Sequence, residues 1–204
     1  MSARPVVTPI VAERVIVSGT KCSVEVREFY HDFKPTFDVT ETVNRLLTGI
    51  PPEYISGIKT VVLRDATGLS HQQRRKKVRS KKKHQHGESL GSYFPAWKGE
   101  FAWIQLLVDN VIENWPAVFL KISFFRDLAF ANVLFHEIGH HIHKTRVREF
   151  ANDENVAERW RRKLTAYYMR HTYWYLMPLF WLTHYTVMFF RGTYDFLRKV
   201  KKDH

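Results

Sequence analysis

An α+β domain with a mixed, twisted sheet is the fold class that the sequence predicts, and three observations predict it. Residues 58–66 (IKTVVLRDA) and 101–108 (FAWIQLLV) are short runs rich in β-branched and aromatic residues, which is typical of strands. Residues 125–148 and 152–171 carry helical patterns, and the first is apolar nearly all round, as in a buried helix. The 204 residues, 45% hydrophobic and 15% aromatic, are enough for one packed domain.

Alternation and turn residues indicate the remaining elements. Residues 15–27 alternate in polarity and predict a strand or a hairpin. Residues 40–49 predict a helix that ends at a glycine, before a pair of prolines. Residues 91–108 predict two short strands joined by a Lys-Gly turn at residues 98–99, so that strands come first and the long helices follow.

The chain is expected to form one domain over residues 1–170, with a basic loop inserted at residues 71–86. This loop holds eight lysines and arginines and no acid, which is two thirds of the net charge of +12. It has no apolar periodicity, so a solvated loop is the simplest interpretation. Nucleic-acid binding through residues 74–83 is a minor alternative, because the loop contains no aromatic side chain on which a base could stack.

Residues 171–204 form a separate C-terminal segment. Residues 173–190 include no charged side chain, and this run of 18 lies at the lower edge of a membrane-spanning length. Pro178, His184 and many tyrosines and tryptophans weaken a spanning interpretation. Three alternatives stay open: an apolar, aromatic helical hairpin packed on the domain, a helix associated with a membrane surface, and a membrane-spanning helix. Because the N-terminus has no signal-peptide core, we expect a cytoplasmic protein, with association to a membrane surface through residues 173–190 as the alternative.

The motif FHEIGHHIH at residues 135–143 predicts a metal site. On a helix, side chains four residues apart share a face, so His136 and His140 point together with Glu137 beside them. This HExxH pattern is typical of two Zn²⁺ ligands and a general base. His143 lies about 4.5 Å further along the helix axis than His140. We expect it to form hydrogen bonds at the surface or behind the ligands, and not to bind the metal itself. Cys22 is the only cysteine, so the ligands have to be histidines and carboxylates.

A third ligand is expected on the next helix. Arg146 stands six residues after His140, where another arrangement would place a third histidine. The segment ENVAE instead puts Glu154 and Glu158 on one helical face, after enough residues for the chain to turn back antiparallel. Ala157 is small enough to let the two helices approach closely.

HEIGHH followed by ENVAE resembles the gluzincin branch of zincin metallopeptidases, especially the minigluzincin and ImmA/IrrE-like domains. The resemblance covers residues 136–158 and implies a small zincin-like domain with a buried HExxH helix and a glutamate-ligand helix. It also implies that His136, His140 and Glu154 bind zinc, that Glu137 is the general base, and that Glu158 orients a ligand histidine.

The resemblance further implies a zinc metallopeptidase that hydrolyses peptide bonds with a metal-bound water activated by Glu137. A peptide or protein substrate would pair as an extended strand with an edge strand at residues 101–109. An internal strand with no ligand is the alternative for that segment. The alternative functions are a zinc-binding, non-proteolytic interaction module and a membrane-surface or nucleic-acid-binding protein that works through the basic loop. The residues expected to bind substrate are Trp103, Ile104, Gln105, Leu106 and Leu107.

Overall fold

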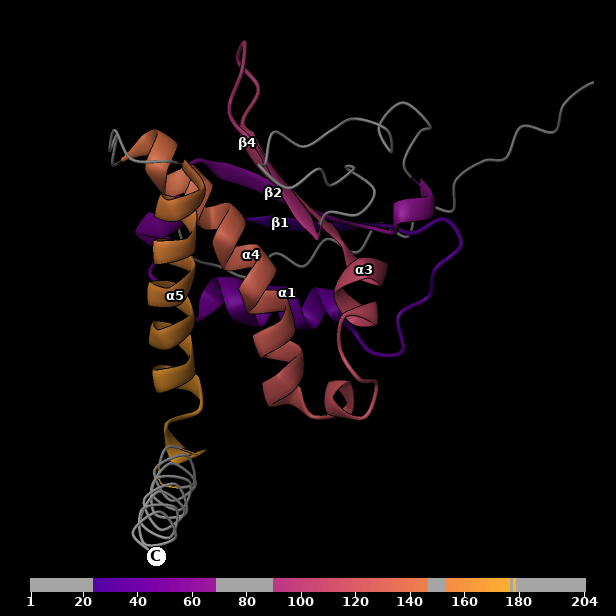
Figure 1. Cartoon of the computed structure of the whole chain (residues 1–204). Coiled ribbons are helices and arrows are strands. Elements are labelled where there is room, and N and C mark those ends of the chain that lie inside the picture. The colour runs from indigo at the N-terminus through magenta and orange to yellow at the C-terminus, as the bar shows by residue number, and fades with distance from the viewer. Residues whose placement is uncertain (1–23, 69–89, 147–152, 177, 179–204) are drawn as a thin grey trace, which may run out of the picture.

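The computed structural model describes residues 24–68, 90–146, 153–176 and 178, and within them the chain forms a mixed α+β structure (Figure 1). The four strands are β1 (Glu25–Phe29), β2 (Ile58–Arg64), β3 (Gly91–Phe94) and β4 (Ala102–Leu107). The helices are α1 (Val39–Thr48), α3 (Val108–Glu113), α4 (Ser123–Thr145) and α5 (Asp153–Thr172). Short 3₁₀ turns include η4 (Phe119–Lys121) and η5 (Trp174–Leu176).

The four strands form one sheet in the order β1-β2-β4-β3. The first three strands in this order run parallel, whereas β3 pairs with β4 antiparallel. The mixed sheet that the sequence predicts is therefore confirmed. The predicted strand at residues 15–27 lies mostly outside the described residues, and β1 begins at its end.

The hairpin at residues 91–108 is also confirmed, but the predicted edge strand is wrong. Lys98 and Gly99 have φ values of 47° and 89°, and Trp97 and Glu100 exchange backbone hydrogen bonds across this two-residue turn. The turn folds β3 back onto β4, whose other side pairs with β2. Residues 101–109 thus contribute an internal strand, and among the described strands β3 takes the edge position.

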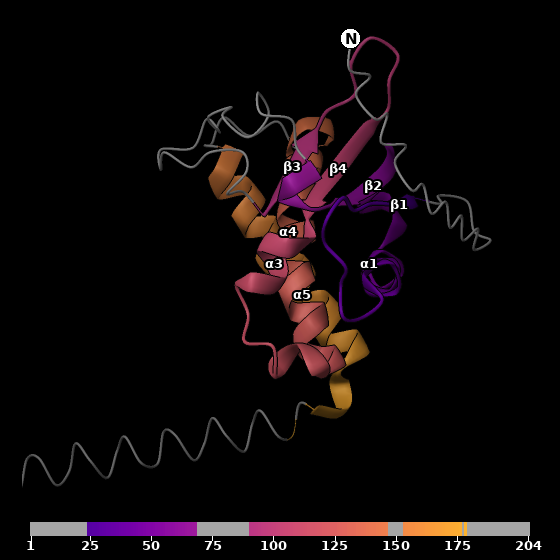
Figure 2. The same cartoon turned by 90° about the vertical axis from the view of Figure 1, so that its right-hand side faces the viewer.

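Helices α1 and α4 pack against one face of the sheet, as two perpendicular views show (Figures 1 and 2). The core between them is apolar: Val61, Leu63, Ile104 and Leu106 of the sheet are fully buried together with Phe130 of α4. Alternate residues of each strand point into this core because strand side chains alternate between faces. Helix α5 lies beside α4 and extends the helical layer.

Helix α1 begins and ends at recognisable capping residues. The side chain of Asp38 accepts a hydrogen bond from the backbone N–H of Glu41, which satisfies one of the free donors of the first turn. Asp38 is therefore the N-cap, two residues before the predicted start. Gly49 ends the helix as predicted, and its N–H bonds to the carbonyl of Arg45.

Asp127 fastens three helical segments together from a fully buried position in α4. Its carboxylate accepts hydrogen bonds from Arg45 Nε (3.1 Å) and Nη2 (2.6 Å) of α1. It also accepts bonds from the hydroxyl groups of Tyr168 (2.5 Å) and Tyr173 (2.8 Å), in and just after α5. A buried charge with this number of partners fixes the helices relative to one another, because any displacement leaves a polar group unpaired.

Two predicted segments lie outside the described residues. These are the basic loop at residues 71–86 and nearly all of the charge-free run at residues 173–190, of which residues 173–176 and 178 are described. Among the residues that the structure does describe, no helix is both long enough and apolar enough to cross a bilayer.

Replacing Asp127 with alanine should lower the free energy of unfolding by about 2–4 kcal/mol, because two tyrosine hydroxyls and a guanidinium lose their common acceptor. Urea unfolding measures the change. Glu41→Ala is the matched control, since Glu41 pairs with the same Arg45 at 3.2 Å but its side chain is 71% exposed. The control should cost less than about 0.5–1 kcal/mol. Equal losses in the two variants would contradict the role given to Asp127.

Candidate metal site

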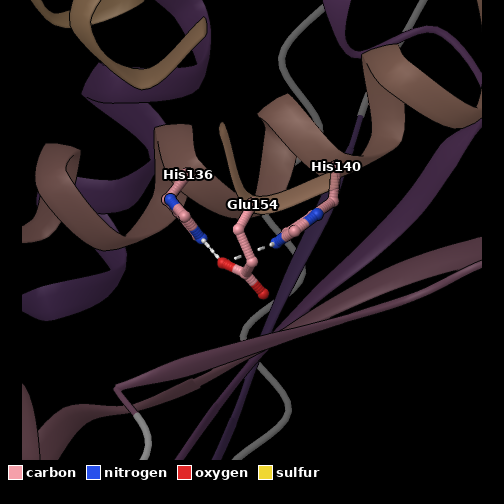
Figure 3. A group of neighbouring side chains, drawn as sticks. All are labelled: His136, His140 and Glu154. Atoms are coloured by element: carbon pink, nitrogen blue, oxygen red, sulfur yellow. Dashed lines mark ion pairs between the residues drawn. The ribbon is translucent and has the colours of Figure 1, made fainter. Parts of the chain in front are cut away.

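His136, His140 and Glu154 come together between α4 and α5, as the sequence predicts (Figure 3). One potential ligand atom from each residue lies within 4.8 Å of the others. The Nε2 atoms of His136 and His140 lie 3.4 Å and 4.0 Å from Oε2 of Glu154. The two imidazole rings are nearly perpendicular, with centroids 4.8 Å apart. Helical spacing accounts for the pair of histidines, and the antiparallel return of α5 brings the carboxylate opposite them.

The donor set fits a zinc ion. Two imidazole nitrogens and one carboxylate oxygen are the ligands of known catalytic zinc sites, which leave a fourth position open. Ligands at ~2.0–2.1 Å from zinc in a tetrahedron stand roughly 3.3 Å from each other. The separation of 3.4 Å between His136 and Glu154 matches this spacing, and the 4.0 Å separation from His140 exceeds it by less than 1 Å.

The lowered pKa of His136 favours its neutral form, which can bind a metal but cannot form an ion pair with Glu154. Burial and the neighbouring His140 lower the pKa of His136, and the nearby carboxylates of Glu154 and Glu158 offset these effects only in part. A neutral imidazole keeps a lone pair for a metal but forms no salt bridge with a carboxylate. The close approach of the Glu154 carboxylate to a neutral His136 is thus the arrangement that a bound cation would stabilise.

Asp153 contacts His140 at Nδ1, the ring nitrogen that faces away from Glu154, and the sequence did not predict this contact. Its Oδ1 atom lies 3.2 Å from Nδ1 of His140 and 2.7 Å from Nδ1 of His143. Burial tends to raise the pKa of Asp153, but the hydrogen bonds from the two histidines outweigh it and hold the pKa below its usual value. An ionised carboxylate at Nδ1 keeps the proton there and leaves Nε2 of His140 to face the site.

His143 is held outside the cluster, as predicted, because its Nδ1 donates a hydrogen bond to Asp153. Asp153 could be found in sequence only as the residue that starts α5. Its contact with two histidines depends on how the helices cross, which the sequence does not reveal.

Glu158 lies beside His136 on the side away from the cluster. Its Oε2 atom is 4.0 Å from Nδ1 of His136, beyond hydrogen-bond distance. Arg161 donates two hydrogen bonds to the Glu158 carboxylate, at 2.6 and 2.7 Å, and Arg162 donates one at 2.9 Å. These bonds, led by those from Arg161, lower the pKa of Glu158 to about 2. Glu158 is therefore an ionised neighbour of His136, and it is Asp153 that lies closer to a histidine of the cluster.

Glu137 points from α4 toward strand β3 and is 7% exposed. Burial, followed by the charge of Glu154, raises the pKa of Glu137 to about 8, while a hydrogen bond from the backbone N–H of Tyr93 acts in the opposite direction. A divalent cation at the cluster would favour the charged form of Glu137. Gly91 makes room for this carboxylate, because a Cβ atom there would lie 3.2 Å from Oε1 of Glu137 and 2.8 Å from Val133.

His141 is a structural histidine with both ring nitrogens occupied. Nε2 lies 2.9 Å from the carbonyl oxygen of Ser56, and Nδ1 lies 3.0 Å from the hydroxyl of Tyr93. Since a carbonyl oxygen only accepts, Nε2 carries the proton and Nδ1 accepts from Tyr93. His141 therefore anchors β3 to α4, and Tyr93 joins the edge strand to the helix through both its backbone and its hydroxyl.

Gly139 and Ala157 set the distance between α4 and α5. A Cβ atom at Gly139 would lie 2.6 Å from the carbonyl oxygen of Ala157 and 2.8 Å from its Cα, so the backbones touch at this point. Both residues lie within one turn of the cluster, between the two ligand-bearing faces. The predicted close approach at Ala157 is confirmed, and the glycine of HEIGHH is what permits it from the other side.

The residues expected to bind substrate on β4 are not arranged for that role. Ile104, Gln105, Leu106 and Leu107 are at most 3% exposed, and their backbones pair on both sides within the sheet. Trp103 is the exception: its ring stacks on Phe94 at 3.9 Å and lines a surface groove of about 520 Å³ together with residues such as Arg27 and Lys59. No residue of the metal cluster lines this groove.

Comparisons of the chain with protein-family models, with curated proteins and with solved structures give no match. The resemblance to gluzincins therefore depends on the residues of the motif and on the geometry of the His136, His140 and Glu154 cluster.

The variant Gly139→Ala should destabilise the protein by about 1–3 kcal/mol, because the added methyl group forces α4 and α5 apart. Helix propensity alone predicts the opposite sign, since alanine stabilises a helix interior by about 1 kcal/mol relative to glycine. Thermal unfolding of the zinc-free protein decides between the two. A variant as stable as the parent, or more stable, would mean that the helices do not touch here.

The variant Asp153→Ala should weaken zinc binding by roughly tenfold to a hundredfold, because His140 loses the carboxylate that orients its ring. A competition titration with a zinc chelator measures the affinity. Asn155→Ala is the matched control, as Asn155 is exposed on the same turn of α5. Equal affinities for Asp153→Ala and the control would remove Asp153 from the site.

Proposed function

We propose that the protein is a zinc-dependent metallopeptidase of the HExxH gluzincin type, which hydrolyses peptide bonds. The observation that carries the proposal is the convergence of His136, His140 and Glu154 within 4.8 Å, with the buried Glu137 beside them. The cluster joins two helices, α4 and α5, and each of its histidines has a second carboxylate near its Nδ1 atom. A pair of histidines brought together by helical spacing alone would need neither feature.

The chemistry of the donor set favours Zn²⁺ as the ion. His136, His140 and Glu154 would hold it, while the nearby carboxylates of Asp153 and Glu158 would add to the negative potential around it. When bound, zinc supplies Lewis acidity, which polarises a carbonyl group and makes a water molecule more acidic.

Glu137 is the proton carrier in this proposal. Its carboxylate accepts the proton of the attacking water and then delivers that proton to the nitrogen of the leaving amine. The burial that raises its pKa makes Glu137 a stronger base than an exposed glutamate. Its position against β3 places the base next to the edge of the sheet.

Strand β3 replaces residues 101–109 as the proposed docking edge for an extended peptide. In the sheet of the described residues β3 has one neighbour, β4, so one side of its backbone faces away from the sheet. A peptide added there as a further strand would run past Glu137, which already contacts Tyr93 and Gly91 of β3. Because Glu137 lies next to β3, we expect the protein to recognise the backbone of the peptide, with little dependence on the peptide's side chains.

The variant Glu137→Gln should lose peptide hydrolysis by about 10²–10⁴-fold, because a glutamine side chain cannot carry the proton. Zinc content should stay unchanged, since Glu137 is not among the three ligands. Cleavage of a mixture of quenched fluorescent peptides, measured beside elemental analysis of the same samples, tests both statements. Glu113→Gln, an exposed glutamate at the end of α3, is the control and should retain full turnover.

Two outcomes would count against this function. Zinc bound at one equivalent with no turnover in the parent protein, under conditions that saturate the site, would favour a non-proteolytic zinc-binding module. Turnover that survives Glu137→Gln would show that another group carries the proton.

A further inference from the structure

An exposed apolar surface covers the end of the helical layer that lies farthest from the hairpin of β3 and β4. Its residues come from the segment around η4 and from η5. These two segments are far apart in the sequence, but Phe124 and Tyr173, which flank them, are in contact. The exposed fractions are large for side chains of these types: 63% for Val118, 41% for Phe119, 52% for Ile122, 69% for Trp174 and 57% for Tyr175. We call these five residues the aromatic end.

Ring contacts through Phe125, Phe124 and the buried Tyr173 link the two parts of the aromatic end. Phe125 lies 4.9 Å from Phe119 and 5.2 Å from Phe124, between ring centroids. Phe124 in turn lies 5.1 Å from Tyr173, and Tyr173 lies 6.1 Å from Tyr175. The buried hydroxyl of Tyr173 is fixed by Asp127, so these rings are attached to the core. A surface of this kind marks a binding site far more often than scattered single apolar residues do.

The two chain segments that carry the aromatic end are basic. Residues 114–126 and 159–178 contain no aspartate or glutamate. Lys121 and Arg170 are exposed within these two segments, close to the apolar residues in the chain. Exposed tryptophan and tyrosine next to lysine and arginine are typical of surfaces that sit at the interface between water and anionic lipid.

The sequence that continues from this end has the same character. The charge-free run begins at Tyr173, directly before Trp174 of the aromatic end, and extends to Phe190. The remaining residues 191–204 hold five lysines and arginines and two aspartates. The chain therefore leaves the described structure at the aromatic end with a long apolar stretch followed by a basic one.

We propose that the aromatic end is a docking surface for an anionic lipid bilayer. Trp174 and Tyr175 would lie at the level of the lipid head groups, with Val118 and Ile122 beside them, and Lys121 and Arg170 would face the anionic charge. A second copy of the chain is the competing occupant. The absence of acidic residues from both segments argues against it, because two copies meeting through this surface would bring like charges together.

Docking through this surface would hold the metal site above the membrane. Glu154 is at the start of α5, and Trp174 and Tyr175 of the aromatic end follow its last residue, so Glu154 is separated from them by roughly 27 Å along the helix axis. Peptides reached by the site would then be those that stand clear of the bilayer by about this distance. The docking surface itself does not depend on zinc, so its test stands apart from that of the proposed function.

Flotation of the full-length protein with vesicles tests the proposal. Vesicles of phosphatidylcholine mixed with phosphatidylserine should carry the protein, and vesicles of phosphatidylcholine alone should carry less. Trp174→Ser should weaken partitioning by at least roughly tenfold, because a large aromatic side chain no longer enters the interface. Trp97→Ser is the matched control: Trp97 is 70% exposed, almost the same as Trp174, but flanks the hairpin turn at the opposite end (Figure 1).

The triple variant Val118→Ser, Ile122→Ser, Trp174→Ser separates the aromatic end from the residues that follow it in the chain. It should partition still more weakly than Trp174→Ser, while unfolding as the parent does, because all three side chains are exposed. Partitioning of the triple variant equal to that of the parent would overturn the proposal. So would failure of the parent to bind either vesicle, or a dimer in lipid-free solution that Trp174→Ser dissociates.

Discussion

The close contact between α4 and α5 at Gly139 and Ala157 is the constraint on which the candidate metal site depends. Backbones that touch at this point leave the histidines of α4 facing the glutamate of α5 at 3.4 and 4.0 Å. Any larger side chain at Gly139 would move one ligand-bearing face away from the other. Glycine is an unfavourable residue inside a helix, so its presence in the middle of α4 has a structural cost that the close contact explains.

The same pair of helices is fastened at two further places. Asp127 connects the N-terminal part of α4 to α1 and to the C-terminal end of α5 through hydrogen bonds with Arg45, Tyr168 and Tyr173. On the other side, Tyr93 ties α4 to the edge strand through Glu137 and His141. The helix that carries the two histidines is thus held by a second helix, by a buried carboxylate and by the sheet. A metal site needs this rigidity because its ligands have to stay within tenths of an ångström of their places.

Much of the site could be predicted from sequence because helical periodicity determines it. His136, His140 and Glu154, together with the small residue at Ala157, follow from the spacing of four residues and a short antiparallel return. Features that depend on contacts between distant segments could not be predicted. The hairpin at residues 91–108 was visible, but not which strand would become the edge. Asp153 and Asp127 were unremarkable acids in sequence, and their roles come from the packing of helices.

Zinc content of the full-length protein, purified with zinc and then dialysed, tests the central claim most directly when it is measured beside Glu154→Ala and His143→Ala. The account predicts one zinc per chain in the parent, its loss on removal of the Glu154 carboxylate, and its retention without His143, which bonds to Asp153 outside the cluster. A protein that binds no zinc, or that keeps its zinc without Glu154, would contradict the ligand set and with it the metallopeptidase.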